Sequence, residues 1–330
     1  MSACAEGRRS IQRLPLVTLY ITERCNSRCR SCDYWRHGHL DLNLDSLRQR
    51  LPQLVQLGTR IVVLSGGEPL VHPDFAAIAQ CLRAQGMQVW LLTAGLALAK
   101  HAQRAATLFD CITVSLDGTD RETYAALRGL DAFDTVCAGI RAAVSHGAAP
   151  SLRVTLQRGN FRQLARFVDL GKTLGARSVS FLAVDVANSN AFARQPPFAS
   201  DLALTAPELP EFAQQLAALE RTHAADFASG FIAESAQKLR RILEYFHAVC
   251  GLGPYPQVRC NAPEFSAVIG ADGQLKPCFF IPAPAPGPAD DLEGMLNSAP
   301  MMQLRADIRA GRRPECKACV CSMWREVALA

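Results

Sequence analysis

The sequence predicts an α/β fold, a partial (β/α)6 TIM-like barrel followed by a small C-terminal module with a β-hairpin and helices. Short β-branched runs alternate with longer segments of helical periodicity, which is typical of βαβ units and a parallel sheet. Six such units are too few for a closed eight-stranded barrel, so we expect an open, curved sheet with its site at the carboxyl ends of the strands. The strands are expected at 16–21, 61–64, 89–92, 112–116, 152–156 and 179–184.

Helices are expected between these strands and after them. Leu44, Leu47 and Leu51, for example, recur at a spacing that places them on one face of a helix. The polar, proline-containing stretch 187–200 is expected to be a loop. On the same criteria we expect helices at 44–55, 75–82, 96–108, 121–127, 133–144, 161–174, 207–223, 231–249 and 298–310.

A second module is expected after the barrel. A strand at 265–269, the turn Gly270-Ala271-Asp272-Gly273 and a return strand into Cys278 form a hairpin, because Asp-Gly between two apolar runs is a strong turn signal. A Pro/Ala-rich linker at 282–288 is expected to be extended. We therefore expect an N-terminal tail at 1–13, the barrel at 14–225, a helical connection at 226–257 and the module at 258–330.

The composition is that of an ordinary soluble protein. The chain has 330 residues, a net charge of +5 and 13 cysteines. No apolar run approaches the ~20 residues that cross a membrane, and the first residues lack the apolar core of a signal peptide, so a cytoplasmic location is expected. Arginines come in pairs rather than in long runs, which argues against a nucleic-acid partner. In a cytoplasmic chain, so many cysteines indicate metal or redox chemistry rather than disulfides.

Three of the cysteines lie close together just after the first expected strand. Cys25, Cys29 and Cys32 supply three thiolates where a closed tetrahedral site uses four, and an open coordination position is typical of a catalytic metal site. Thiolates bind either iron–sulfur clusters or zinc. With His37 or His39 as a fourth ligand, the same loop would make a Cys3His zinc site.

A second motif distinguishes these two interpretations. Cys25-x3-Cys29-x2-Cys32, followed after the second strand by Gly66-Gly67-Glu68-Pro69, resembles the radical S-adenosylmethionine (SAM) superfamily over about residues 14–184. The turn Ser115-Leu116-Asp117-Gly118 after the fourth strand strengthens the resemblance. A structural zinc site has no use for the Gly-Gly-Glu-Pro turn, so the resemblance is favoured over zinc.

The resemblance implies a [4Fe–4S] cluster held by Cys25, Cys29 and Cys32, with one iron left free for the amino and carboxylate groups of SAM. One electron from the reduced cluster then breaks the S–C5′ bond, which gives methionine and a 5′-deoxyadenosyl radical that abstracts hydrogen from a substrate.

The same resemblance assigns the contacts of SAM. Gly66 and Gly67 would let the backbone approach the methionine amino group, and Glu68 would accept a hydrogen bond from it. Thr93 and Ser115, at strand ends, are assigned to the ribose hydroxyls. Arg153 alternates with its apolar neighbours. It is the expected partner of the methionine carboxylate if it faces the barrel interior, whereas a surface salt bridge is the alternative.

Two positions depart from the family pattern. Ser31 precedes the third cysteine, where an aromatic residue is common, so an adenine contact would have to come from backbone or from Tyr34 or Trp35. The turn after the third strand, Thr93-Ala94-Gly95, replaces a common Thr-Asn-Gly.

The remaining clustered cysteines resemble the twitch domain, the shorter relative of the SPASM domain. Cys260-x12-Gly273-x4-Cys278 precedes Cys316-x2-Cys319. The resemblance implies one auxiliary [4Fe–4S] cluster held by Cys260, Cys278, Cys316 and Cys319, with Cys321 an alternative fourth ligand and a second auxiliary cluster not expected. Spacing alone also allows a Cys4 zinc ribbon.

Other candidates carry weaker signals. Cys250, close in sequence to the second module, is a candidate hydrogen-atom donor of the kind an epimerase needs, or an ordinary buried thiol. Cys81, Cys111 and Cys137 sit in apolar patterns and are expected in the core, and Glu234 and Asp185 lie where substrate contacts are plausible.

The expected function is that of a radical SAM enzyme whose auxiliary cluster assists electron transfer in an oxidation or a bond formation. Only about fifteen residues precede the first strand, too few for an N-terminal peptide-recognition domain. We therefore expect a small natural-product or sugar-like substrate and a reductant such as flavodoxin or ferredoxin. A peptide maturase, an epimerase using Cys250, and a non-catalytic zinc or iron–sulfur binding protein are the alternatives.

Overall fold

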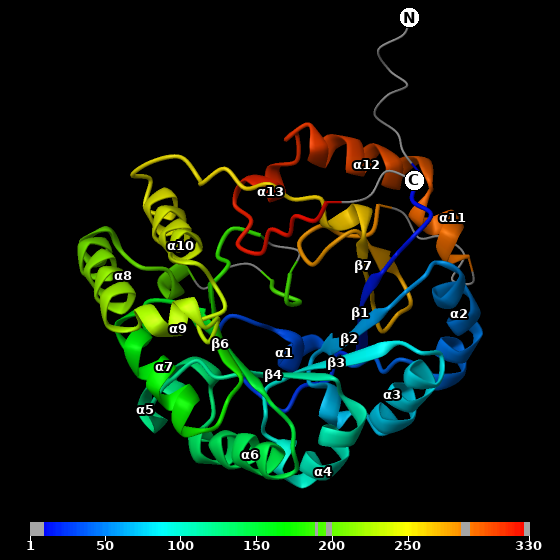
Figure 1. Cartoon of the computed structure of the whole chain (residues 1–330). Helices are drawn as coiled ribbons and strands as arrows, with labels where there is room; N and C mark the ends of the chain where they lie inside the picture. Colours follow the sequence, from blue (N-terminus) through cyan, green and yellow to red (C-terminus); the bar gives the residue numbers. More distant parts are fainter. Residues whose placement is uncertain (1–9, 189–190, 196–199, 285–290, 327–330) are drawn as a thin grey trace, which may run out of the picture.

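The six expected strands form one parallel sheet that continues beyond them. The computed structural model describes residues 10–188, 191–195, 200–284 and 291–326. Eight strands are hydrogen-bonded in the order β6-β5-β4-β3-β2-β1-β7-β8, and the sheet does not close on itself (Figure 1). The six predicted strands are confirmed to within two residues at either end. The strands are β1 (Leu16–Thr22), β2 (Ile61–Gly66), β3 (Gln88–Thr93), β4 (Cys111–Ser115), β5 (Ser151–Leu156), β6 (Ser178–Ala183), β7 (Ser266–Ile269) and β8 (Leu275–Lys276).

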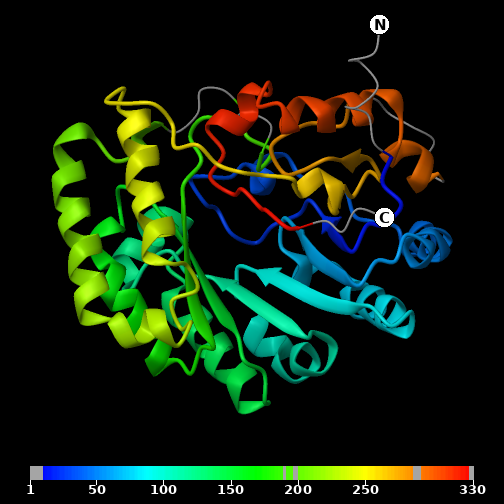
Figure 2. The same cartoon turned by 45° about the horizontal axis from the view of Figure 1, so that its top comes forward.

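Helices cover the convex face of the sheet, and the predicted long helices are present (Figures 1 and 2). Sequence periodicity missed α1, α9, α11 and α13 because four- or five-residue helices are too short to show it. The helices are α1 (Tyr34–His37), α2 (Leu44–Gln56), α3 (Phe75–Ala84), α4 (Leu98–Leu108), α5 (Arg121–Arg128), α6 (Phe133–Ser145), α7 (Leu164–Thr173), α8 (Leu209–Thr222), α9 (Ala224–Ala228), α10 (Ala236–Val249), α11 (Leu292–Leu296), α12 (Ala299–Arg309) and α13 (Pro314–Lys317).

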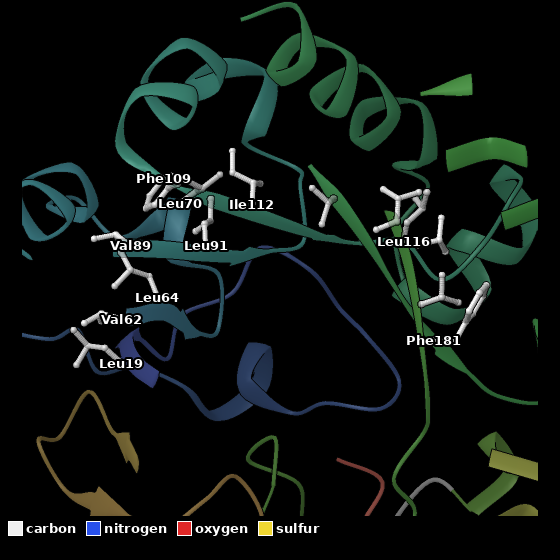
Figure 3. Close-up of a cluster of buried hydrophobic side chains, with 14 of the residues drawn as sticks. Leu19, Val62, Leu64, Leu70, Val89, Leu91, Phe109, Ile112, Leu116 and Phe181 are labelled. Carbon is white, nitrogen blue, oxygen red and sulfur yellow. The ribbon is translucent and has the colours of Figure 1, made fainter. Parts of the chain in front are cut away.

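Strand alternation divides the side chains between the two faces of the sheet. Aliphatic residues such as Val62, Leu64 and Leu91 are buried beneath the helices, as Figure 3 shows for part of this core. The intervening positions, among them Thr113 and Ser115, lie on the concave face and are only half-buried. Since successive strand residues point to opposite faces, the core occupies the helical side, and the concave side carries less buried residues that include Trp90 and Leu92 of β3 as well as Thr113 and Ser115.

One predicted helix begins later than expected. Residues 231–249 were expected to be helical, but α10 begins at Ala236, where the Ser235 side chain accepts the Lys238 N–H. Before it, Ile232 forms a parallel bridge with Val179 of β6, whose N–H donates to the Phe231 carbonyl at 2.7 Å. The exposed backbone groups of an edge strand need partners, and this requirement outweighs the helical periodicity.

The C-terminal hairpin is confirmed, and it is joined to the barrel. β7 pairs in parallel with β1, with Leu16 opposite Ser266 and Leu19 opposite Ile269. β8 returns antiparallel to β7. The second cysteine module therefore extends the barrel sheet itself, while most of the expected linker at 282–288 lies outside the described residues.

The last described segment crosses back over the hairpin. The Asn261 N–H donates to the Met323 carbonyl at 3.0 Å, and its side chain bonds the backbone of Arg325. Figure 1 shows this segment, in red after α13, between β7 and α10. Over the described part of the chain, no helix combines the length and the apolar character that crossing a bilayer requires.

Candidate active site

The first cysteine loop and the Gly-Gly-Glu-Pro turn are bonded directly to each other. The Gly67 N–H donates to the Thr22 carbonyl at 2.7 Å, and the Glu68 N–H donates to the Arg24 carbonyl at 2.9 Å. A Cβ on Gly67 would lie 2.2 Å from the Arg24 carbonyl oxygen, and Gly66 has φ +117°. Only glycine allows so close an approach, so the two motifs form one structural unit at the carboxyl ends of β1 and β2.

The three thiols of this loop lie in partly buried, apolar surroundings. Cys25 and Cys32 pack beside Tyr20 and Tyr34, and the Ser27 N–H points to the Cys25 Sγ at 3.4 Å. Burial raises the pKa of Cys25 to about 11 and that of Cys32 to about 12. The thiols of Cys25 and Cys32 are therefore protonated at neutral pH, and binding of a cationic metal centre would displace their protons.

These residues fit a [4Fe–4S] cluster. Three thiols, an N–H group directed at sulfur and apolar packing make up the donor set that iron–sulfur clusters use in proteins. Among the described residues, no three His, Cys, Asp or Glu side chains are placed to hold a single metal ion.

Glu68 is fully buried and holds the ends of β2 and β3 together. Its Oε1 accepts hydrogen bonds from the Thr93 hydroxyl at 2.7 Å and the Leu70 N–H at 3.0 Å, and its Oε2 accepts the Ala94 N–H at 2.6 Å. Burial nevertheless raises the pKa of Glu68. The Thr93 hydroxyl also accepts the Gly95 N–H, so it supports Glu68 here; its ribose contact stays a prediction.

Ser115 and Arg153 lie side by side on the concave face. They are paired in register on β4 and β5, and Arg153 is paired in turn with Ser180 of β6. The Arg153 Nε is buried without a hydrogen-bond partner in the described chain, and the surface salt bridge considered as an alternative is not formed. Its direction toward the barrel interior is confirmed, while its SAM contact stays a prediction.

The five C-terminal cysteines line one cavity of about 500 Å³. The cavity lies along the start of β1, and its apolar wall includes Leu16, Tyr255 and Phe279. The predicted ligands Cys260, Cys278, Cys316 and Cys319 are thus brought together, with Cys321 beside them. Such a donor set in an apolar pocket fits an iron–sulfur cluster.

Within this cavity, Cys319 and Cys321 have different surroundings. The Cys321 N–H donates to the Cys319 Sγ at 3.4 Å. Burial raises the pKa of the Cys321 thiol, but the charges of Arg153 and Lys238 oppose that rise. Cys321 is thus within the influence of the charges of Arg153 and Lys238, while Cys319 already receives the kind of N–H bond that stabilises a cluster thiolate.

Tyr20 lies between the two cysteine groups, and sequence reasoning missed it. Its ring packs edge-on against Tyr34 at 6.0 Å and stacks on Phe279 at 6.5 Å between ring centroids. Burial and the neighbouring Tyr34, Cys32 and Cys278 raise its pKa well above the usual value. Its position on β1, one alternation from Thr18, could have placed it on the concave face, but its neighbours could not be read from sequence.

A buried ion pair behind the first loop was also missed. Arg128 Nη1 lies 3.1 Å from Asp117 Oδ2, and Asp117 Oδ1 accepts the Thr155 N–H at 2.7 Å. Asp117 was recognised only as part of a turn. Burial alone would lower the pKa of Arg128, but the charges of Cys29 and Asp117 outweigh it and raise the pKa.

Several other candidates are held elsewhere. Cys250 ends α10, its thiol donates to the Leu204 carbonyl at 3.3 Å, and it is not among the residues that line the cavity of the C-terminal cysteines. Glu234 accepts bonds from the Ser180 hydroxyl and the Phe181 N–H and so completes the edge of β6. Asp185 pairs with Arg194 at 3.1 Å.

The remaining residues named from the sequence fall as follows. Cys137 is a buried core thiol, whereas Cys81 and Cys111 are half-buried. The Trp35 indole N–H donates to the Cys29 carbonyl at 3.3 Å, which braces the first loop.

The fold and the site together define an α/β protein with a three-thiol iron–sulfur loop at the carboxyl edge of an open barrel. A family model described as the radical SAM superfamily matches residues 19–169. These residues therefore form a radical SAM domain, the domain of a family of enzymes that uses SAM and a [4Fe–4S] cluster.

Two curated relatives match the chain at low sequence identity. An AdoMet-dependent heme synthase of Methanosarcina barkeri is 30% identical over 168 residues, 49% of this chain and 48% of the relative. A probable GTP 3′,8-cyclase of Saccharolobus islandicus is 26% identical over 269 residues, 80% of this chain and 82% of the relative. The chain thus matches about half the length of the heme synthase and most of the cyclase.

Solved structures show the same fold. Streptococcus suis SuiB bound to S-adenosylmethionine has a TM-score of 0.68 at 14% identity, covering 94% of this chain and 73% of SuiB. The enzyme anSMEcpe with bound AdoMet and Cp18Cys peptide has a TM-score of 0.66 at 17% identity, covering 93% and 86%.

Proposed function

We propose that this protein reductively cleaves SAM to a 5′-deoxyadenosyl radical and abstracts hydrogen from a small natural-product or sugar-like substrate, with an auxiliary [4Fe–4S] cluster taking up an electron. The observation that carries this proposal is the presence of two cysteine groups at opposite ends of β1. One group follows its carboxyl end and the other lines a cavity beside its first residues.

At the first site the chain positions SAM. The bound cluster supplies the electron that breaks the S–C5′ bond. Cys25, Cys29 and Cys32 would hold it, and the Gly66-Gly67 turn, which is hydrogen-bonded to the cysteine loop, would bring its backbone next to the methionine amino group. Among the described residues, Glu68 Oε2 accepts one hydrogen bond, from the Ala94 N–H, so it retains a lone pair for that ammonium group.

At the second site, we assign Cys260, Cys278, Cys316 and Cys319 to the auxiliary cluster. The Cys321 N–H directed at the Cys319 Sγ favours Cys319 over Cys321 as the fourth ligand. Phe279 of the cavity wall stacks on Tyr20, and Tyr20 packs in turn against Tyr34, beside Cys25 and Cys32. This continuous aromatic contact suits electron transfer between the two sites.

The reaction class follows from these positions. The Cys250 thiol donates to the Leu204 carbonyl and is not among the residues that line the cavity of the C-terminal cysteines, so no observed contact favours epimerisation through it. Oxidation or bond formation, with the electron passed to the auxiliary cluster, is therefore preferred. The name of the GTP 3′,8-cyclase, which matches 80% of the chain, supports a small-molecule substrate. We place the enzyme in the cytoplasm, reduced by a flavodoxin or a ferredoxin.

Anaerobic reconstitution tests the proposal without a substrate. Iron, sulfide and zinc are counted, dithionite and SAM are added, and 5′-deoxyadenosine is measured beside a Cys25/Cys29/Cys32→Ala variant. About eight irons, with cleavage lost in the variant, are expected for two clusters. About four irons with cleavage intact would remove the auxiliary cluster, and bound zinc without cleavage would refute the proposal.

A further inference from the structure

The first cysteine loop rests on the end of α5. The Arg28 N–H donates to the Arg128 carbonyl at 3.1 Å, and the Arg30 N–H donates to the Leu127 carbonyl at 3.1 Å. Cys29, between these two donors, is therefore held against the last turn of α5. Gly129 ends the helix with φ +73°, and a Cβ there would lie 2.2 Å from the Arg28 carbonyl oxygen.

The side chain of Arg128 is fixed from behind. It is 9% exposed, and Asp117, itself 3% exposed, holds its Nη1 at 3.1 Å. Asp117 is fixed in turn, because its Oδ1 accepts the Thr155 N–H at 2.7 Å. Because these bonds fix the guanidinium of Arg128, its orientation is preorganised and little side-chain entropy remains to be lost when it forms another hydrogen bond.

One donor of Arg128 is left without an acceptor. Its Nε is buried and has no hydrogen-bond partner in the described residues. A buried unsatisfied donor destabilises a fold, so such a group indicates an acceptor that arrives with a ligand. The backbone of Arg128 contacts the loop directly, since its carbonyl accepts the Arg28 N–H at 3.1 Å and the Ser27 hydroxyl at 3.4 Å. The charges of Cys29 and Arg128 act on each other, in agreement with this position beside the three thiols.

We propose that Arg128, oriented by Asp117, is a positioning residue of the first cluster: its guanidinium supplies the positive charge that balances the thiolates of Cys25 and Cys29. Reduction adds one negative charge to a centre that already carries three thiolates. A fixed positive charge in a site of low dielectric constant stabilises that reduced form more than the oxidised form. Arg128 thereby raises the reduction potential of the cluster and helps to retain it.

The test compares variants that alter charge while preserving bulk. Arg128→Met is combined with Asp117→Asn, so that no uncompensated carboxylate remains buried, and the double variant is compared with Asp117→Asn alone, so that only the guanidinium charge differs. Arg128→Lys keeps the charge but loses the planar fork. Arg50→Met is the matched control, because Arg50 is 7% exposed and bonds the Gly273 carbonyl, away from the first loop.

Iron content and the potential of each cluster are measured by EPR-monitored redox titration of the reconstituted proteins. The signal that SAM perturbs belongs to the first cluster. At a given applied potential, the double variant should show about a tenfold lower ratio of reduced to oxidised first cluster than Asp117→Asn alone, equal to 59 mV for one electron. The lysine variant should recover most of this change, and Arg50→Met should show none.

Two results would overturn this role. The first is a double variant that holds its cluster at an unchanged reduction potential but binds SAM more weakly. That result would assign the Arg128 Nε to the SAM carboxylate instead. The other is an equal fall in the lysine variant, which would mean that charge is not the cause. A wild-type protein that binds no reducible cluster would contradict the proposed function as well, so the two failures are distinguishable.

Discussion

Replacement of Gly67 by alanine is the sharpest test of how the two motifs are joined. The new Cβ would lie 2.2 Å from the Arg24 carbonyl oxygen and 2.6 Å from that of Glu23, and both of these atoms belong to the backbone. Relief requires the cysteine loop to move, because backbone cannot rotate away as a side chain can. Overpacking of this kind costs about 2 kcal/mol. The displaced loop would also weaken two hydrogen bonds, from the Gly67 N–H to the Thr22 carbonyl and from the Glu68 N–H to the Arg24 carbonyl. Their weakening adds about 1 kcal/mol to the loss of stability.

We therefore expect Gly67→Ala to lower the free energy of unfolding of the metal-free protein by about 3 kcal/mol. It should also lower the iron retained after reconstitution, since the loop that holds the thiols is displaced. Urea unfolding and iron analysis measure the two effects. Gly86→Ala is the control: Gly86 has φ +78° with no atom within 4 Å of the added Cβ, so only the left-handed strain of about 1 kcal/mol applies. Equal losses in both variants, with full iron in Gly67→Ala, would refute the steric argument.

Three further predictions follow from the site. Burial raises the folded-state pKa of Glu68, so its contribution to stability is present below its unfolded pKa and is lost as pH rises through the folded pKa. Glu68→Gln should remove this part of the pH dependence of the free energy of unfolding, measured with urea. An unchanged pH profile would contradict the raised pKa of Glu68. Cys319→Ser should lose about four irons on reconstitution, whereas Cys321→Ser should retain them, and the reverse pattern in iron analysis would make Cys321 the ligand. Tyr20→Ala should lower the free energy of unfolding by about 3–5 kcal/mol, because the packing of the ring against Tyr34 is lost. Tyr20→Phe keeps the ring and should lower it by no more than about 1 kcal/mol in the same denaturant unfolding experiment. Similar losses in both variants would show that the hydroxyl, not the ring, stabilises the fold.

The sequence was sufficient where a local pattern decides the structure. Strand periodicity located the six barrel strands, and the spacing of Cys25, Cys29 and Cys32 with the turn at 66–69 indicated one site, which the bond from Glu68 to Arg24 supports. These features depend on neighbours in the chain or on strand ends, both of which are visible in a one-dimensional pattern.

It was insufficient where distant segments decide. Arg128 ends an ordinary amphipathic helix, and only the docking of the cysteine loop shows that its buried face is a site. The stretch before Ala236 keeps helical periodicity, yet the open edge of β6 draws it into an extended pairing. The pairing of β7 with β1 likewise depends on a free strand edge, which no residue pattern identifies.

The pairing of β7 with β1 fixes the position of the second cysteine group relative to the first. Because one strand carries the first loop at its end and borders the second cavity at its start, backbone geometry rather than a hinge between domains sets their separation. A chimera that replaces the C-terminal module would have to supply its own strand to β1, in the register of Leu16 with Ser266. Without such a strand, the edge of β1 would be left open to pair with another molecule. The C-terminal module can therefore be exchanged only together with the strand that pairs with β1.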